Sequence, residues 1–240
     1  MTQPLFRYEP AILERYPSIV GGTLHVTGAS NGPTPAALAD AYTQEQRATI
    51  ARVGSTPLSE LPSIVAWRRA FRAFGVDPTQ YRSAAEALLR RLTKQGEIPS
   101  INTLVDIGNL VSIRHALPVA ILDLASIRDG LTVRFADGDE RFTDLGSGSI
   151  EAPEPGEVIF IDAAGHVAAR RWCWRQSAES ASSATTTDML ITVEGHHEDA
   201  REDVLAATAD LEALIRANSA PGSIVTGLVD IADPAFETAG

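Results

Sequence analysis

The sequence predicts an α+β fold in which helices pack on antiparallel sheets. Helical patterns fill most of the first half of the chain, whereas short strand patterns separated by Asp-Gly and Pro-Gly turns fill much of the second half. A long amphipathic helix pattern over 198–218 and a strand pattern over 223–231 follow. Because the 240 residues are 44% apolar, we expect one compact body with a substantial core.

The first half begins with a weakly alternating segment over 18–29, which predicts a strand. Capping and terminating residues then mark three helices: one that starts at Thr34-Pro35 and runs toward Gly54, one over 64–74 with Ser63 as its cap and Gly75 at its end, and one over 83–95 that stops at Gly96. Pro99 turns the chain into a fourth, asparagine-bearing helix.

The second half contains runs of alternating or apolar residues that are short enough to be strands. We expect these strands over 131–136, 141–145, 157–162, 166–174 and 189–195. In the run over 166–174, strand alternation would put Arg171, Cys173 and Arg175 on one face and Trp172 and Trp174 on the other.

Composition limits the chemistry. Cys173 is the only cysteine, which excludes an internal disulfide and a zinc cluster. The five histidines lack metal-ligand spacing except for the adjacent pair His196 and His197, and neighbours on a chain rarely point at one ion. We therefore expect no metal and no cofactor. Phosphate-cradling glycine motifs are absent, which argues against ATP-driven ligation. With neither a signal peptide nor an apolar stretch of membrane-spanning length in the sequence, we expect a cytoplasmic protein without a membrane partner.

The formal net charge of −11 argues against sequence-independent nucleic-acid binding. Basic residues nevertheless concentrate between Trp67 and Lys94, where seven arginines and lysines accompany only Asp77 and Glu86. This segment could present a basic face to a tRNA acceptor end. Alternatively, its arginines are solvated helix faces with local ion pairs.

The segment INTLVDIGNLVSIRHALPVAILD, residues 101–123, is the most informative in the chain. Together with LTVRFADGDERF at 131–142, GEVIFIDAAGHVAARRW at 156–172 and TTTDMLITVEG at 185–195, it resembles the editing module of the phenylalanyl-tRNA synthetase beta subunit, formed by that subunit's third and fourth modules. The matching residues in the first segment are Ile101, Asn102, Val105, Asp106, Asn109, Val111, Pro118 and Asp123. The resemblance covers roughly Leu61 to Gly195. We therefore expect residues 61–240 to form an editing-module-like domain, with the strand and helix of residues 1–60 packed on it.

The resemblance implies a free-standing, trans-acting editing hydrolase that removes a wrong amino acid from aminoacyl-tRNA. Its expected partners are the tRNA acceptor end, the aminoacyl group and the amino acid. One alternative is a binding module of the same fold that recognises an amino acid or aminoacyl-tRNA without hydrolysis. Another is a small-molecule enzyme built on the same pocket.

Two residues are the candidate catalytic groups. Asn109 matches a pocket asparagine of the family, although an amide at the edge of an apolar helix face can also bond a neighbouring loop. The alignment sets Glu179 over a pocket glutamate that would hold the substrate amine or orient water, although it could equally be a loop residue. The hypothesis places Asn109, Ala120 and Glu179 around one cavity.

Further pocket positions follow from the same resemblance. Ala120 stands where the synthetase module has a histidine, so this chain supplies no imidazole there, and only His115 lies near in sequence. Asp123 is a candidate substrate contact, although it and Asp106 fit backbone capping better than an acid–base pair. Arg171 and Arg175 are candidates for binding a carboxylate or tRNA phosphate.

Overall fold

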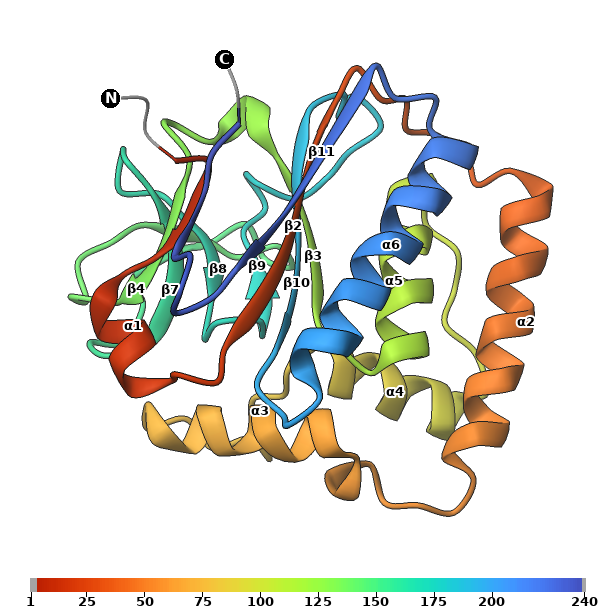
Figure 1. Ribbon diagram of the computed structural model, residues 1–240, viewed down its shortest axis with the longest axis horizontal. Coiled ribbons are helices and arrows are strands. Elements are labelled where there is room, and N and C mark those ends of the chain that lie inside the picture. The colour runs from red at the N-terminus through yellow and green to blue at the C-terminus, as the bar shows by residue number, and fades with distance from the viewer. Residues whose placement is uncertain (1–3, 239–240) are drawn as a thin grey trace.

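The computed structural model describes residues 4–238 and arranges them in three layers (Figure 1). A six-stranded sheet packs against a four-stranded sheet, and helices cover the outer face of the four-stranded sheet. The predicted α+β class with antiparallel sheets and packed helices is confirmed.

The helices are α1 (Pro10–Arg15), α2 (Ala36–Val53), α3 (Pro62–Ala73), α4 (Ala84–Gln95), α5 (Thr103–His115) and α6 (Ala200–Asn218), with short 3₁₀ turns η1 (Leu58–Glu60) and η2 (Leu124–Ser126). The strands are β1 (Phe6–Tyr8), β2 (Val20–Thr27), β3 (Val119–Asp123), β4 (Leu131–Phe135), β5 (Phe142–Thr143), β6 (Ile150–Glu151), β7 (Val158–Asp162), β8 (Val167–Arg170), β9 (Arg175–Gln176), β10 (Met189–Gly195), β11 (Ser223–Val229) and β12 (Ala235–Phe236).

The four-stranded sheet has the order β11-β2-β10-β3, and all its neighbouring strands are antiparallel. Strand β2, from the first 60 residues, is central and pairs with β10 on one side and β11 on the other. Segments 20–27 and 223–229, far apart in the sequence, are therefore built into the same sheet as the middle of the chain.

Both faces of β10 are buried, and its alternating side chains enter two different cores. Met189, Ile191 and Val193 belong to the core between this sheet and α2, α4, α5 and α6. Leu190 belongs to the second core, between the two sheets. The even-numbered residues of β10 therefore face the six-stranded sheet.

The six-stranded sheet has the order β12-β1-β4-β7-β8-β9. Its strands are antiparallel except for the β1–β4 pair, which is parallel. Phe6 and Phe160 fill the core between the sheets, and Trp67 and Phe71 of α3 join it. Helix α3 runs along the lower edge of both sheets in Figure 1.

Two predicted helix caps are wrong. Helix α2 starts at Ala36 without a side-chain cap, because the Thr34 hydroxyl instead donates to Asp106 at 2.6 Å. Helix α3 starts two residues earlier than expected, with Pro62 in its first turn, so Ser63 lies inside the helix. By contrast, α4 stops at Gly96 as predicted, and Ser83 caps its start by accepting a hydrogen bond from the Glu86 N–H group.

The strand expected over 166–174 is also interrupted. Strand β8 ends at Arg170, and Arg171 and Trp172 have positive φ angles of 44° and 61°. This turn carries the Trp172 indole into the core between the sheets, whereas Trp174 stays half-buried. The predicted alternation of an arginine face and a tryptophan face is therefore wrong, because burial of one large aromatic side chain overrides strand periodicity.

Among the residues described, the structure contains no helix with the length and apolarity needed to cross a bilayer.

The Asp106 carboxylate should be a strong local determinant of stability. It is fully buried and accepts hydrogen bonds from Thr34, Ser100 and the Ile101 N–H group. Asp106→Ala leaves these donors without an acceptor, which typically costs about 1–3 kcal/mol per unsatisfied buried group. We expect urea unfolding to show at least that loss, and Thr34→Val, which removes one donor, to lose less. Equal stability of Asp106→Ala and the parent would contradict this assignment.

Candidate functional site

A cavity of about 220 Å³ lies between the two sheets. Most of its wall is apolar. Its lining residues are Ala84, Pro118, Val119, Ala120, Leu145, Phe160, Ala169, Trp172, Cys173, Trp174, Arg175, Gln176, Thr192 and Glu194. Strands β3 and β10 form one wall, and β7, β8 and the segment 172–176 form the other.

The pairing of β3 with β10 places the polar groups of the first wall. Ala120 stands directly opposite Thr192 in the ladder, and Glu194 follows two residues later on the same face of β10. The small Ala120 side chain leaves room in front of Thr192. Ala120, a candidate pocket position from the sequence, therefore borders the cavity.

Glu194 is the buried carboxyl group of this cavity, with only 2% of its surface exposed. Its Oε1 atom accepts hydrogen bonds from the Tyr8 hydroxyl at 2.5 Å and from the Trp172 indole N–H at 3.0 Å. Burial raises the pKa of Glu194 to about 7, and these two donors oppose that rise. The carboxyl group can therefore exist in either protonation state near neutral pH.

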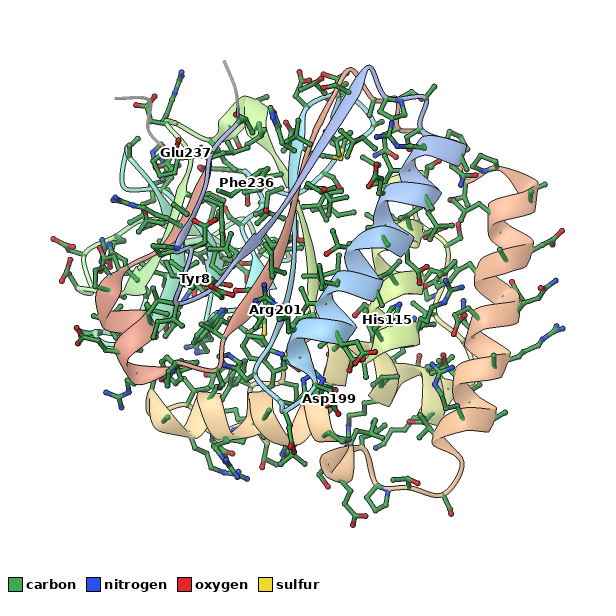
Figure 2. The ribbon with its side chains drawn as sticks, in the orientation of Figure 1. Tyr8, His115, Asp199, Arg201, Phe236 and Glu237 are labelled. Carbon is green, nitrogen blue, oxygen red and sulfur yellow. The ribbon has the colours of Figure 1, made fainter. Side chains whose placement is uncertain are left out.

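Tyr8 reaches Glu194 because of a glycine on β2. Gly21 is paired with Glu194 in the β2–β10 ladder, and a Cβ atom at Gly21 would lie 2.5 Å from the Tyr8 hydroxyl oxygen. A larger residue there would push the phenol away from the carboxylate. Figure 2 shows Tyr8 lying between the two sheets.

Arginine side chains surround Trp174 at the edge of the cavity. Arg175 lines the cavity, pairs with Asp144 at 2.5 Å and has its guanidinium carbon 4.6 Å from the centre of the Trp174 ring. Arg171 also packs against Trp174, and lies 3.9 Å from the centre of the Tyr81 ring. Thus Arg175 is the cavity cation, whereas Arg171 is held in an aromatic stack next to it.

The structure places Asn109 and Asp123 away from this lining. Asn109 lies on α5 beside Tyr42 of α2, whereas Gly108 is the residue of α5 that faces Val119 and Ile121 of β3. Asp123 caps η2 through the Ala125 N–H group and accepts a hydrogen bond from Thr186 at 2.5 Å. The Asp123 contacts are those of a capping residue.

Glu179 lies on the segment after β9 and is also outside the lining of this cavity. Its Oε1 atom accepts hydrogen bonds from Arg141 and from the Thr143 hydroxyl, each at 2.8 Å. The sequence predicts Asn109, Ala120 and Glu179 around one cavity, and only Ala120 lines this cavity. Among the other candidate residues, Arg175 also lines it.

The cavity offers neither a histidine nor a thiolate as a reactive group. No histidine lines it, and His115, labelled in Figure 2, bonds Asp210 of α6 at 2.8 Å in the helical layer. Cys173 does line it, but burial raises the pKa of its thiol well above the ordinary value, and the nearby Glu194 carboxylate adds to this shift. Cys173 therefore remains protonated and is a poor nucleophile.

One group of carboxylates in the described part of the chain is close enough to share a metal ion: Asp137, Asp139 and Glu140. Asp137 and Asp139 are exposed, whereas Glu140 is buried. Glu140 already accepts hydrogen bonds from the Asp137 and Gly138 N–H groups and pairs with Arg134 at 2.7 Å. These bonds show that the Glu140 carboxylate stabilises the backbone of residues 137–140.

Sequence reasoning missed Glu194, although a signal was present. Glu194 is the one charged residue in the apolar strand pattern MLITVEG. A carboxylate inside a strand that is buried on both faces is costly unless it is hydrogen-bonded, so it marks a position with a special role. Its partners Tyr8 and Trp172 are distant in sequence, and only the packing of the two sheets shows them together.

Comparison with known proteins identifies the family. Residues 66–208, more than half of the chain, match the B3/4 domain. A similar solved structure is an N-terminal fragment of the phenylalanyl-tRNA synthetase beta-subunit from Pyrococcus horikoshii, with 12% identity and a TM-score of 0.46 over 91% of this chain. The chain spans about half of that fragment, 49% of its length. A comparison with curated protein sequences gives no significant match. The chain therefore belongs to the B3/4 domain family, the domain type found in the phenylalanyl-tRNA synthetase beta subunit.

Proposed function

We propose that this protein is a trans-acting editing hydrolase that accepts the aminoacyl group of a mischarged tRNA in the cavity between the sheets. The observation that carries the proposal is Glu194, a buried carboxyl group with a pKa near neutrality that faces a small apolar cavity. Membership of the B3/4 domain family supports the substrate class.

The size of the cavity suits one amino-acid side chain. Its volume of about 220 Å³ is below the roughly 300–1,000 Å³ that is usual for drug-sized ligands. Phe160, Trp172 and Ala120 offer apolar contacts to such a side chain. Thr192, Gln176 and Arg175 supply the polar contacts that would orient the ester.

Glu194 would act as the general base. Both of its hydrogen bonds from the protein go to Oε1, which leaves Oε2 to accept a proton from water or to bind the substrate ammonium group. In hydrolysis, the water oxygen bonds to the ester carbonyl carbon as Glu194 takes the water proton. The bond between that carbon and the ribose oxygen then breaks, and the proton passes to this oxygen, which leaves as the ribose hydroxyl while the amino acid is released as a free acid. A base with a pKa near the working pH is well matched to this task.

The same cavity also supports an alternative, a module that binds an amino acid or aminoacyl group without hydrolysis. The observation that favours it is the absence of histidine and thiolate from the cavity lining, since these are the commonest groups for water or ester activation. Glu194 would then serve only as the acceptor for the ammonium group.

Two carboxylates compete for the catalytic role, and their variants discriminate between them. With a panel of mischarged tRNAs, we expect Glu194→Gln to lower deacylation by about a hundredfold or more, because it removes the charge while keeping the shape. Glu179→Gln, the matched surface change, should affect the rate little because Glu179 is engaged by Arg141 and Thr143. Circular dichroism and thermal melting verify that both variants are folded.

The opposite ranking would assign catalysis to Glu179, as the sequence alignment suggests. If the parent protein deacylates no substrate but binds amino acids by calorimetry, the binding module replaces the hydrolase. If it does neither, the proposed function is wrong.

Burial of Glu194 also predicts how stability depends on pH. The pKa of Glu194 is about 7 in the folded protein against an ordinary value of 4.5, so the folded state binds the extra proton between these limits. The Glu194 contribution to the free energy of unfolding is therefore greatest below pH 4.5 and is lost as pH rises toward 7, by at most about 1.4 kcal/mol per pH unit.

Glu194→Gln removes this dependence. Urea unfolding of parent and variant at several pH values should thus give a stability difference that changes across pH 4.5–7 and is constant above it. Buried His196, whose pKa is lowered to about 3 by desolvation, contributes the opposite slope as pH falls below about 6.5, but it is common to both proteins and cancels in the difference. A difference independent of pH would show that Glu194 titrates normally.

A further inference from the structure

A second concavity lies directly beside the cavity, on the exposed face of α4. We call it the basic groove and define it by Arg82, Arg90, Arg91, Lys94 and Arg175, its five cationic lining residues. Its volume is about 410 Å³, and neither aspartate nor glutamate occurs among its lining residues. Five cations in one groove are unexpected for a chain with a formal net charge of −11.

Three of these cations have no anionic partner among residues 4–238. Arg90, Arg91 and Lys94 are exposed and form no ion pair in the part of the chain that the structure describes. Arg82 lies 3.8 Å from Glu86, and Arg175 pairs with Asp144. The buried face of α4, with Leu89 and Leu92 in the core, fixes the helix so that these cations must point outward.

The basic groove and the cavity share part of their walls. Trp174 and Arg175 line both of them. A ligand lying along α4 would therefore pass Trp174 and reach the cavity with its end. The cavity holds only one small group, so an extended polyanion can enter it only by a chain terminus.

We propose that the basic groove binds the phosphodiester backbone of a single-stranded RNA end and directs the aminoacyl group carried by that end into the cavity. This inference rests on the proposed function and identifies the part of the protein that holds the tRNA. Exposed cations at the spacing of one helix face neutralise successive phosphates and release counterions, which gives affinity without base specificity. The end of a duplex would instead bring two strands to a cavity that has room for the end of one strand.

The test uses a fluorescent eight-nucleotide single-stranded RNA with a free 3′ hydroxyl group and the full chain. The groove variant is Arg90→Gln, Arg91→Gln and Lys94→Gln combined. The matched control is Arg47→Gln, Arg69→Gln and Arg72→Gln combined, which removes the same charge from exposed positions on α2 and α3. Anisotropy is measured at several salt concentrations.

For the parent protein, we expect binding that weakens with salt. The groove variant should bind at least tenfold more weakly, and its slope of log K against log salt should be smaller by about two, since each lost phosphate contact on a single strand contributes about 0.7. The control should keep the parent slope. With charged tRNA, the groove variant should raise KM without lowering kcat.

Several outcomes would overturn the inference. One is an equal loss of RNA affinity in the groove variant and the control variant. Another is binding of duplex RNA or of polyglutamate as tight as that of the single-stranded RNA. A third is displacement of the RNA by millimolar inorganic phosphate, which would indicate a site for the free anion. The inference and the proposed function can fail separately. Hydrolysis of amino-acid methyl esters without RNA binding would overturn only the groove, and groove-dependent RNA binding without any aminoacyl hydrolysis or amino-acid binding would overturn only the cavity.

Discussion

The structure depends on β10 being buried on both faces. Its odd-numbered residues pack on the helices and its even-numbered residues face the second sheet, so neither face is open to bulk water. A polar residue on such a strand must find a partner inside the protein. The Tyr8 hydroxyl and the Trp172 indole provide these partners for Glu194, and both reach it from the side of the six-stranded sheet, Tyr8 from β1 and Trp172 from the turn after β8.

This constraint connects several irregular features. Gly21 removes a side chain where the Tyr8 hydroxyl must pass. Arg171 and Trp172 take positive φ angles at the point where the chain leaves β8, which carries the Trp172 indole toward Glu194. Such conformations cost free energy in residues with a side chain. Their occurrence beside the buried carboxyl group supports the view that the cavity is a built site.

Charge is distributed unevenly over the molecule. The chain is acidic overall, yet three exposed cations, Arg90, Arg91 and Lys94, lie together on α4, whose apolar face anchors it to the helical core. Arg175 joins the groove to the cavity, because it faces both. A small apolar cavity beside a groove of cations suits a ligand with an uncharged or zwitterionic end and an anionic chain.

The sequence alone predicted the family and the order of the longer helices and strands, because hydrophobic periodicity, helix ends such as Gly96 and motifs such as residues 101–123 are local properties of the chain. It also marked Ala120 as a pocket position. The cavity itself could not be predicted in this way: Glu194, Tyr8 and Trp172 come from three separate strands or turns, and only sheet packing brings them together. For the same reason the alternating pattern of residues 166–174 gave a wrong prediction of a continuous strand, since burial of the Trp172 side chain outweighed local strand propensity. Only the tertiary structure decided which carboxylate is buried in the cavity. Burial of a side chain depends on which elements pack against its strand, and the sequence of the strand alone does not specify those elements.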